Sequence, residues 1–580
     1  MLSLLALFLL AFTPVTAHTS RKSSYSDQDA LLAFKKAVLV DPYRSLGNWS
    51  TNHTLCNWTG VTCSSRRERV ISLNLTGMAL LGYISPYLGN LSFLSTLVLK
   101  NNSFEGQIPP QLGRLFRLRM LRLSRNDLEA SIPPELGDCR SLQSLTLSYN
   151  NLTGSIPPQL GRLSKLEAMA LAMNQLTGTI PSFIANMSSL IQLDLGSNRL
   201  HGVIPVELGT LTQLKLLFLG LNNFTGPIPA ILSNCSLLQN LSLQDNLLTG
   251  DIPWQFGKLS ELQELILWEN QLTGKVPSSL SNCTQLEQPV LAINQLEGTL
   301  PLEFAKLLQL RRFEVRENHF VSGSNHLPIL TALANCSKLN VLDLAWNNFT
   351  GVIPSSVGHS LDGSIPNSLG DAKRLGFLSL SENKLSGQIP DTLGNLTQLR
   401  YIYLDHNHLS GEIPASLGRC RSLMLLDLAY NNLAGNIPPE VAALPDLQFY
   451  FNVSRNLLQG SLLGMSNMLM VRAIDVSMNK FSNGIPSAIA SCIALEYLNL
   501  SWNAFTGPIP TSLAKLVNLQ LMDLSFNNLT GTIPGNFKDM KMLRNINLSS
   551  NRLTGEVPQG GVFAELDVSA LMNNLGLCGT

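Results

Sequence analysis

Residues Leu142–Pro157 read LQSLTLSYNNLTGSIP, and most of the chain repeats this pattern. Leu142, Leu145 and Leu147 cannot all lie on one helical face, whereas Leu145 and Leu147, two residues apart, have the spacing of a half-buried strand. Asn150 follows, and its side-chain amide can bond backbone groups that a tight turn leaves unpaired. The stretch therefore predicts a short strand and a turn that is anchored by an asparagine.

The asparagine of this pattern recurs at a constant interval. Ten copies stand 24 residues apart, at Asn102, Asn126, Asn150, Asn174, Asn198, Asn222, Asn246, Asn270, Asn294 and Asn318. We count 20 full units, from one near Val70 with Met78 in the asparagine position to one at Asn551. Such regularity is typical of a solenoid, in which each coil lies on the preceding one. We therefore expect one elongated domain.

The composition excludes several classes of partner. Charged residues make up 14% of the 580 residues and the formal net charge is +1, which argues against binding nucleic acid or an anionic membrane surface. No apolar run of about 18 or more residues follows the N-terminus, so the sequence predicts no membrane span within this chain.

The N-terminus predicts secretion. Residues 1–17 are apolar and end in the small residues Val15-Thr16-Ala17, which is typical of a signal peptide and its cleavage site. Asn-x-Ser/Thr sequons support the same compartment. The candidate glycosylation residues are Asn48, Asn52, Asn57, Asn90, Asn151, Asn186, Asn223, Asn282, Asn348, Asn395 and Asn528.

A cap is expected between the signal peptide and the first coil. Ser26–Asp29 can cap a helix that continues to about Leu39, where Asp41-Pro42 ends it. Such a helix would cover the exposed leucine edge of the first coil. Cys56 and Cys63 follow with six residues between them, which in a secreted chain favours a local disulfide. The alternative, a metal site, would need two more ligands beside these cysteines, and His53 alone does not supply them.

The second half of the repeat identifies its family. In Leu152-Thr153-Gly154-Ser155-Ile156-Pro157 the glycine permits a backbone conformation that other residues resist, and the proline stiffens the extended run. The unit LxxLxLxxNxLxGxIPxxLGxL resembles the plant-specific extracellular leucine-rich repeat, and the paired cysteines with Trp49 and Trp58 resemble the N-terminal cap of that family. The resemblance implies an α/β repeat solenoid, a right-handed superhelix with a parallel β-sheet on its concave face and short 3-10 or irregular segments on its convex side.

Two irregularities in the repeat make the resemblance to a particular group within this family more specific. The spacing grows to 29 residues between Asn318 and Asn347, and the inserted HLPILTALANCSKL resembles a long repeat midway in immune-type plant receptor kinases. The segment from Gly555 to Gly579 resembles their juxtamembrane cap. Cys578 lacks the second cysteine that closes this cap in the family, which implies an ectodomain that is truncated before the membrane helix and kinase.

A third irregularity departs from the family. Asn347 and Asn383 are 36 residues apart, yet Ile353-Pro354 and Ile365-Pro366 are separated by only 12. Either one coil carries an excursion or half a repeat has been lost. The expected organisation is a signal peptide (1–17), an N-terminal cap (18–69), repeats (70–347), an irregular seam (348–382), repeats (383–558) and an incomplete C-terminal cap (559–580).

No residues suggest catalysis. The sequence has no glycine-lysine phosphate loop, no GxSxG and no HExxH. Asp405-His406-Asn407-His408 is a weak metal candidate, because Asn407 occupies the repeat's asparagine position. Six cysteines share one repeat position and are interpreted as buried thiols: Cys139, Cys235, Cys283, Cys336, Cys420 and Cys492. We therefore predict no enzyme, no metal and no cofactor.

The predicted sheet offers a surface for binding. Strand neighbours about 4.8 Å apart would give 20 coils a ribbon of roughly 95 Å, on which the positions around the two strand leucines face solvent. Aromatic and apolar groups beside charges favour recognition there. The candidate ligand-binding residues are Phe218, Glu264, Ile266, Trp268, Glu269, Arg312, Glu314, Arg316, Phe377, Tyr401, Tyr403, Asp405 and His406. In the last coils, Asp475, Asn499, Asp523 and Asn547 at equivalent positions instead predict side-chain ladders that need no ligand.

The resemblance implies the function. We expect the ligand-binding ectodomain of a plant immune receptor at the extracellular face of the plasma membrane, which binds a peptide or protein ligand on the sheet and engages a shorter leucine-rich-repeat co-receptor kinase. The alternatives are a receptor for an endogenous growth peptide and a secreted leucine-rich-repeat inhibitor or decoy, since the fold alone does not fix the function.

Overall fold

The computed structural model describes residues 22–323, 327–353, 366–462 and 468–578, and the contacts group the chain into two compact units, one ending at Leu200 and one beginning at His201. The expected signal peptide lies outside the described residues. Two units differ from the single elongated domain that the sequence predicts. In a stack of coils each coil contacts mainly its neighbours, so no common core joins the whole chain.

The first unit opens with the cap. Helix α1 spans Lys22–Ala37, and Val38–Val40 form strand β1, which pairs antiparallel with β4 (Leu81–Tyr83). The expected helix boundaries were therefore wrong at both ends. Asp27 is not an N-terminal capping residue: it lies inside the helix, buried, where its carboxylate accepts hydrogen bonds from Arg69. Leu39, expected as the last helical residue, is 61% exposed in β1.

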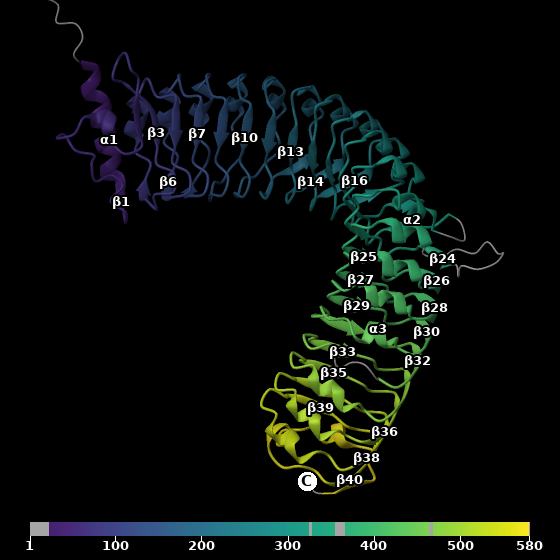
Figure 1. Cartoon of the computed structure of the whole chain (residues 1–580). Coiled ribbons are helices and arrows are strands. Elements are labelled where there is room, and N and C mark those ends of the chain that lie inside the picture. Colours follow the sequence, from purple (N-terminus) through teal and green to yellow (C-terminus); the bar gives the residue numbers. More distant parts are fainter. Residues whose placement is uncertain (1–21, 324–326, 354–365, 463–467, 579–580) are drawn as a thin grey trace, which may run out of the picture. The chain divides into compact units, whose positions relative to one another are not determined.

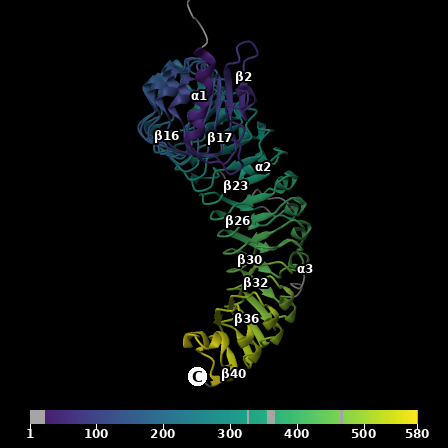
Figure 2. The same ribbon diagram turned by 90° about the vertical axis from the view of Figure 1, so that its left-hand side faces the viewer.

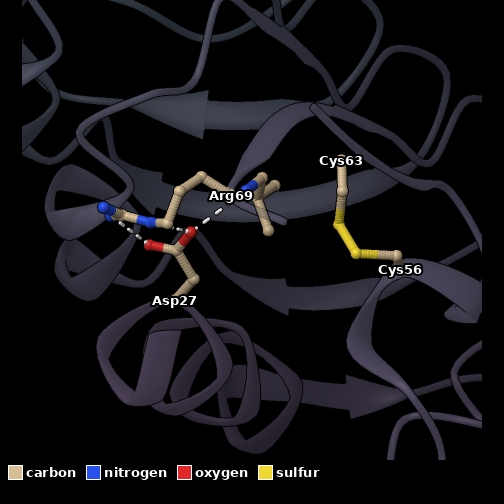
Figure 3. The surroundings of a disulfide bond; sticks show 5 residues. Asp27, Cys56, Cys63 and Arg69 are labelled. Atoms are coloured by element: carbon tan, nitrogen blue, oxygen red, sulfur yellow. Dashed lines mark hydrogen bonds and ion pairs between the residues drawn. A yellow bond between two sulfur atoms is a disulfide. The ribbon is translucent and has the colours of Figure 1, made fainter. Parts of the chain in front are cut away.

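The cap covers the first coils as expected. Ala30, Leu31 and Phe34 of α1 are buried, and the ring of Phe34 lies 5.7 Å from that of Phe104. A disulfide joins Cys56 to Cys63 (Figure 3), so the alternative of a metal site at these cysteines was wrong.

Tryptophans complete the core of the cap. The rings of Trp49 and Trp58 stack with centroids 5.4 Å apart, and both side chains are buried. The Trp49 indole N–H donates to the carbonyl of Thr59 at 3.0 Å. The two tryptophans that the family resemblance singled out therefore pack against each other inside the cap.

Two rows of strands lie on opposite sides of the coils in the first unit (Figure 1). The long row contains β2 (Val61–Cys63), β3 (Val70–Asn74), β5 (Thr96–Val98), β7 (Met120–Arg122), β9 (Ser144–Thr146), β10 (Ala168–Ala170) and β11 (Gln192–Asp194). The second row contains β4, β6 (Ser103–Gln107) and β8 (Asp127–Glu129). From β3 onward the long row is parallel and in register, so that Leu145 lies opposite Leu121 and Met169.

The second unit also contains two rows of strands. Its long row, which is parallel throughout, contains β13 (Leu216–Phe218), β15 (Asn240–Ser242), β17 (Glu264–Ile266), β19 (Gln288–Val290), β21 (Arg312–Glu314), β23 (Val341–Asp343), β25 (Phe377–Ser379), β27 (Tyr401–Tyr403), β29 (Leu425–Asp427), β31 (Tyr450–Asn452), β33 (Ala473–Asp475), β35 (Tyr497–Asn499), β37 (Leu521–Asp523) and β39 (Asn545–Asn547). Figure 1 shows β25, β27 and β29 on one side of the stack and β24, β26 and β28 on the other.

The opposite side of the second unit carries shorter sheets, whose strands follow one another along the stack (Figure 2). These strands are β12 (His201–Val203), β14 (Asn223–Pro227), β16 (Leu247–Asp251), β18 (Gln271–Thr273), β20 (Glu297–Gly298), β22 (His319–Phe320), β24 (Thr350–Ile353), β26 (Lys384–Gln388), β28 (His408–Glu412), β30 (Asn432–Gly435), β32 (Leu457–Gly460), β34 (Lys480–Asn483), β36 (Ala504–Pro508), β38 (Asn528–Gly531), β40 (Arg552–Glu556) and β41 (Gly576–Cys578). The sequence did not predict this second row.

Short helices connect the second row to the next strand of the long row. The 3-10 helix η5 (Pro158–Arg162) begins after Pro157, and the N–H of Leu163 closes it on the carbonyl of Leu160 at 2.9 Å. The others in the first unit are η1 (Leu55–Asn57), η2 (Pro86–Asn90), η3 (Pro110–Arg114), η4 (Pro134–Asp138) and η6 (Ser182–Asn186). The expected 3-10 segments are thus confirmed.

The second unit repeats these helices. Its 3-10 helices are η7 (Val206–Thr210), η8 (Ala230–Asn234), η9 (Trp254–Lys258), η10 (Ser278–Asn282), η11 (Leu302–Lys306), η12 (Asn367–Asp371), η13 (Asp391–Asn395), η14 (Ala415–Arg419), η16 (Ser487–Ser491), η17 (Thr511–Lys515), η18 (Gly535–Asp539), η19 (Gly561–Phe563) and η20 (Val568–Leu571). Within the described residues, two coils have a short α-helix instead, α2 (Pro328–Leu333) and α3 (Pro439–Ala442). Helix α2 lies within the insertion that lengthens the coil before Asn347.

The asparagine ladder joins successive coils as the repeat predicts. The side-chain amide of Asn150 donates to the carbonyls of Leu147 at 2.8 Å and of Leu123, one coil earlier, at 3.2 Å. Its side-chain oxygen accepts from the N–H of Leu128 at 3.1 Å. Because each asparagine bonds backbone groups of two coils, the ladder satisfies polar groups that the stack would otherwise bury unpaired.

The ladder extends beyond the last unit that the sequence analysis counted. The amide of Asn574 donates to the carbonyls of Leu548 and Leu571, both at 3.0 Å, and its oxygen accepts from Leu553 N–H at 3.1 Å. Asn574 stands 23 residues after Asn551 and was interpreted only as part of a cap. One further coil therefore follows Asn551.

Across the expected seam the strands pair directly. Val341, Leu342 and Asp343 of β23 lie opposite Phe377, Leu378 and Ser379 of β25. The ladder continues as well, because Asn383 donates to the carbonyl of Leu344 at 3.0 Å. Residues 354–365 lie outside the described residues, and the coils that flank them stay in register.

Candidate functional site

The six predicted buried thiols are buried. Each lies just after one of the short helices. The thiol of Cys139, for example, lies 3.3 Å from the carbonyl oxygen of Leu112. Burial raises the pKa of Cys139 to about 12 and the pKa of the other five to about 11. Thiols that hold their protons so tightly are poor nucleophiles and poor metal ligands.

The first candidate ligand-binding residues lie on β13, on β17 and just after β17. Phe218, Glu264, Ile266 and Trp268 are half-buried, and Glu269 is exposed. The carboxylate of Glu264 accepts hydrogen bonds from Asn240 on β15 and from Gln288 on β19, the latter at 3.2 Å. Polar side chains on this part of the surface therefore hydrogen-bond to one another across neighbouring strands.

The second group lines a groove of about 1010 Å³ on the long sheet of the second unit. Arg312, Glu314, Arg316, Phe377 and Tyr401 were predicted there from the sequence. The sequence did not predict the other residues that line the groove, which are Asn340, Val341, Asp343, Arg374, Gly376, Gln398 and Arg400. We call this set of twelve residues the arginine groove.

Most of the missed residues share one cause. Only the positions around the two strand leucines were considered, whereas Asn340, Gly376 and Arg400 each precede the first strand residue. Arg374 and Gln398 lie two residues further upstream. A repeat places equivalent residues side by side on successive coils, so reading the sheet surface two or three residues further upstream would have found them.

Ion pairs occupy one end of the arginine groove. Arg312 Nε lies 2.6 Å from Glu314 Oε1, and Arg316 lies 2.5 Å from Glu317 Oε1 and 3.8 Å from Asp343 Oδ2. Glu314 and Asp343 are less than a tenth exposed. Burial raises the pKa of Asp343 to about 6, an effect that Arg316 opposes and Glu314 reinforces.

Aromatic rings form the other end. The ring of Phe377 lies 6.1 Å from that of Tyr401 and 5.7 Å from that of Tyr403, both on the next coil. All three side chains are half-buried. Their rings therefore present partly open apolar faces beside the charges, a combination that binding surfaces favour.

Asp405 and His406 form a separate cluster with Glu382. His406 Nδ1 lies 2.9 Å from Asp405 Oδ2 and 3.4 Å from Glu382 Oε1, and the imidazole stacks on Tyr430 with centroids 3.9 Å apart. Glu382, Asp405 and His406 are the described residues that could hold a metal ion. One hydrogen bond to Asp405 and the neighbouring carboxylate of Glu382 account for this arrangement without a metal.

The last coils form the predicted side-chain ladder. Aspartate and asparagine alternate as the last residue of successive strands, and each asparagine amide donates to the aspartate one coil earlier. These bonds join Asn452 to Asp427 at 3.2 Å, Asn499 to Asp475 at 3.1 Å and Asn547 to Asp523 at 3.5 Å. Alternation prevents like charges from facing each other on adjacent strands.

Comparison with known proteins places the chain among receptors. Residues 24–64 match the leucine rich repeat N-terminal domain, residues 69–226 a leucine-rich repeat region and residues 493–553 a leucine rich repeat. The chain is 31% identical to the Arabidopsis receptor kinase HAESA, solved in complex with the peptide hormone IDA and the co-receptor SERK1, with a TM-score of 0.79 over 95% of this chain and 98% of that chain. The chain belongs to the plant leucine-rich-repeat receptor kinase family.

Other relatives agree with this assignment. The plant peptide hormone receptor RGFR1, solved in complex with RGF2, is 32% identical, with a TM-score of 0.68 over 90% of this chain and 94% of that chain. The receptor-like kinase EFR of Arabidopsis thaliana is 54% identical over 86 residues, and Xa21 of Oryza sativa subsp. japonica is 43% identical over 90 residues. These alignments span 15% and 14% of this chain, and only 8% and 9% of the two relatives.

At least one of the similar solved structures is the ectodomain of a membrane receptor. One solved structure is the ectodomain of the plant membrane receptor kinase GASSHO1/SCHENGEN3, 30% identical with a TM-score of 0.59 over 92% of this chain and 74% of that chain. Among the helices of the described residues, none is long and apolar enough to cross a membrane.

Proposed function

We propose that this chain is the ligand-binding ectodomain of a plant cell-surface immune receptor, which binds a peptide or protein on the long parallel sheet of its second unit and then engages a co-receptor. The observation that carries the proposal is the arginine groove, where charged and aromatic side chains stand together on an otherwise repetitive surface. HAESA and RGFR1 were solved with peptide hormones bound, and HAESA also with a co-receptor, which supports the same mode of action.

The long coil before Asn347 supports the immune assignment. Its insertion, which contains helix α2, resembles the long repeat midway in immune-type receptors. The second candidate is a receptor for an endogenous peptide hormone, favoured by the ligands of HAESA and RGFR1. Both candidates use the same surface and differ in the source of the ligand.

Binding assays on the purified glycosylated ectodomain test the proposal. Peptide fractions from bacterial cultures and from plant tissue are passed over the immobilised chain, and retained peptides are identified by mass spectrometry. We expect retention of a bacterial peptide that is weakened at least about tenfold by Arg316→Ala or Trp268→Ala. A plant peptide retained in its place would favour the hormone receptor.

The chain offers a matched control for the tryptophan. Trp254 in η9, on the helical side of the preceding coil, is 63% exposed and lies outside the long sheet. Trp254→Ala should leave binding unchanged. Equal losses from Trp254→Ala and Trp268→Ala would contradict a site on the long sheet.

A further inference from the structure

Asn340, Gly376 and Arg400 are the residues that immediately precede strands β23, β25 and β27. Because Gly376 has no side chain, it leaves a gap in this row, which we call the slot. The backbone N–H of Gly376 donates to the carbonyl of Asn340 at 2.8 Å, and its carbonyl accepts from the N–H of Arg400 at 2.8 Å. Asn340 and Arg400 therefore flank Gly376 on the neighbouring coils, about 10 Å apart at the usual strand spacing. Gly376 is not among the glycines with positive φ, so the backbone does not require glycine there. The property that distinguishes glycine at this position is that it has no side chain.

A side chain on Gly376 would press on one wall of this slot. A Cβ on Gly376 would lie 3.2 Å from the side-chain oxygen of Asn340 and 3.7 Å from the carbonyl of Gln398. The amide of Asn340 thus borders the slot on one side. Asn340 offers hydrogen-bond donors as well as an acceptor, so this wall is polar.

Among the described residues, two arginines of the groove have no acidic partner. Arg312 and Arg316 lie in ion pairs with Glu314, Glu317 and Asp343. Arg374 and Arg400 are exposed, and within the described part of the chain neither guanidinium has a carboxylate within 4.0 Å or a hydrogen bond to another side chain. Four arginines face two carboxylates in the lining, and the excess positive charge belongs to the pair that borders the slot.

The walls suit a peptide rather than a small ion alone. The groove of about 1010 Å³ has room for several residues of an extended chain, and Phe377 and Tyr401 border it beside Gly376 and Arg400. Guanidinium groups bind carboxylates through paired N–H donors, and aromatic faces hold the apolar parts of neighbouring side chains. Charge and shape are thus complementary to a short acidic segment.

We propose that the arginine groove binds an acidic segment of the peptide ligand, with one Asp or Glu side chain in the slot above Gly376, where Arg374 and Arg400 hold its carboxylate. This inference rests on the proposed function, since it assigns a ligand class to the same surface. It makes Arg374 and Arg400 specificity-determining residues that select an anionic side chain over a neutral one.

Selection from a random linear peptide library on the immobilised ectodomain tests both proposals separately. We expect selected peptides to share an Asp or Glu, and synthetic copies with that residue changed to Asn or Gln to bind at least about tenfold more weakly. Peptides selected without acidic residues would overturn the slot but leave the proposed function standing. If no peptide is enriched over bare resin, both proposals fail.

Variants of the ectodomain locate the effect. The double variant Arg374→Gln/Arg400→Gln should bind the acidic peptide and its amide copy equally weakly, which removes the discrimination. Gly376→Gln leaves the charge unchanged and fills the slot, so it should give the same loss. Arg421→Gln, at an exposed arginine outside the groove, is the matched control and should keep the discrimination. Discrimination that survives in the double variant would overturn the inference.

Inorganic phosphate and sulfate distinguish a peptide site from a small-anion site. Either ion can occupy a pair of guanidinium groups, but neither contacts Phe377 or the length of the groove. We expect 10-fold or larger excesses of phosphate to compete only weakly with the acidic peptide. Competition by phosphate at the peptide's own concentration would show that the groove binds a free anion, and would overturn the assignment to a peptide.

Discussion

The carboxylate of Asp27 in helix α1 and the guanidinium of Arg69 just before β3 form a two-pronged ion pair inside the N-terminal cap (Figure 3). The distances are 2.8 Å from Arg69 Nε and 2.7 Å from the terminal nitrogen, and Asp27 also accepts from the N–H of Val70 at 3.0 Å. Both residues are buried. The pair fixes the cap helix against the first strand of the repeat.

Removing one partner of this pair should loosen the cap. Asp27→Ala removes the carboxylate from a buried guanidinium, which keeps a hydrogen bond to the Ser92 hydroxyl at 3.2 Å, and leaves the Val70 N–H without its acceptor, so we expect a loss of about 3–5 kcal/mol in cap stability. Hydrogen exchange of α1 measures it. Asp138→Ala is the control, because Asp138 pairs with Arg162 at 2.8 Å on an exposed surface, where such pairs contribute about 0–1 kcal/mol. Similar exchange in both variants would contradict the structural role of Asp27.

Replacing one asparagine of the ladder should lower the free energy of unfolding of the first unit. Asn150→Ala leaves the N–H of Leu128 without its acceptor and removes one donor from each of the carbonyls of Leu123 and Leu147, which keep the amides of Asn126 and Asn174. Because one unsatisfied buried group costs about 1–3 kcal/mol, we expect a loss of that size in the first unit, measured by urea denaturation. Lys165→Ala, at an exposed residue, should change the midpoint little. A midpoint unchanged by Asn150→Ala would refute the ladder's contribution.

Thiol labelling should separate the cysteines by burial. Cys578 is exposed in β41, whereas the six cysteines at the repeated helix-end position are buried with raised pKa values. In the folded protein at pH 8 we expect a thiol reagent to modify Cys578 within minutes and the six others only after denaturation. Cys578→Ser should abolish the fast phase. Fast modification of Cys139 would contradict the packing of the helix ends.

The sequence predicted what repetition enforces and missed what depends on single coils. The strand leucines, the turn at Asn150 and the role of Gly154 could be predicted because every coil repeats the same backbone path and must satisfy the same backbone groups. Asp27 was interpreted as a helix cap because its partner Arg69 is 42 residues away, and no local pattern indicates a buried ion pair. The arginine groove was half predicted: its strand residues follow the repeat, whereas Gly376 matters through a side chain that is absent.

The buried carboxylate of Asp343 makes stability depend on pH. Burial raises its pKa from 3.8 to about 6, so the folded state favours the protonated acid. The stability that this preference provides is complete below about pH 4 and is lost as the pH rises through about 6. Asp343→Asn should therefore stabilise the second unit at pH 7.5, by about 3 kcal/mol at most, and should have little effect at pH 4.

Two charged groups act on this carboxylate in opposite directions, and a control isolates the effect of its ionisation. Arg316, 3.8 Å from Asp343, favours the charged form and lowers the expected gain, whereas Glu314 disfavours the charged form and raises it. Thermal melting of native chain, Asp343→Asn and the exposed control Asp371→Asn at pH 4 and pH 7.5 gives the comparison. A gain for Asp343→Asn that is equal at both pH values would mean that the substitution acts through packing and not through ionisation of the buried acid.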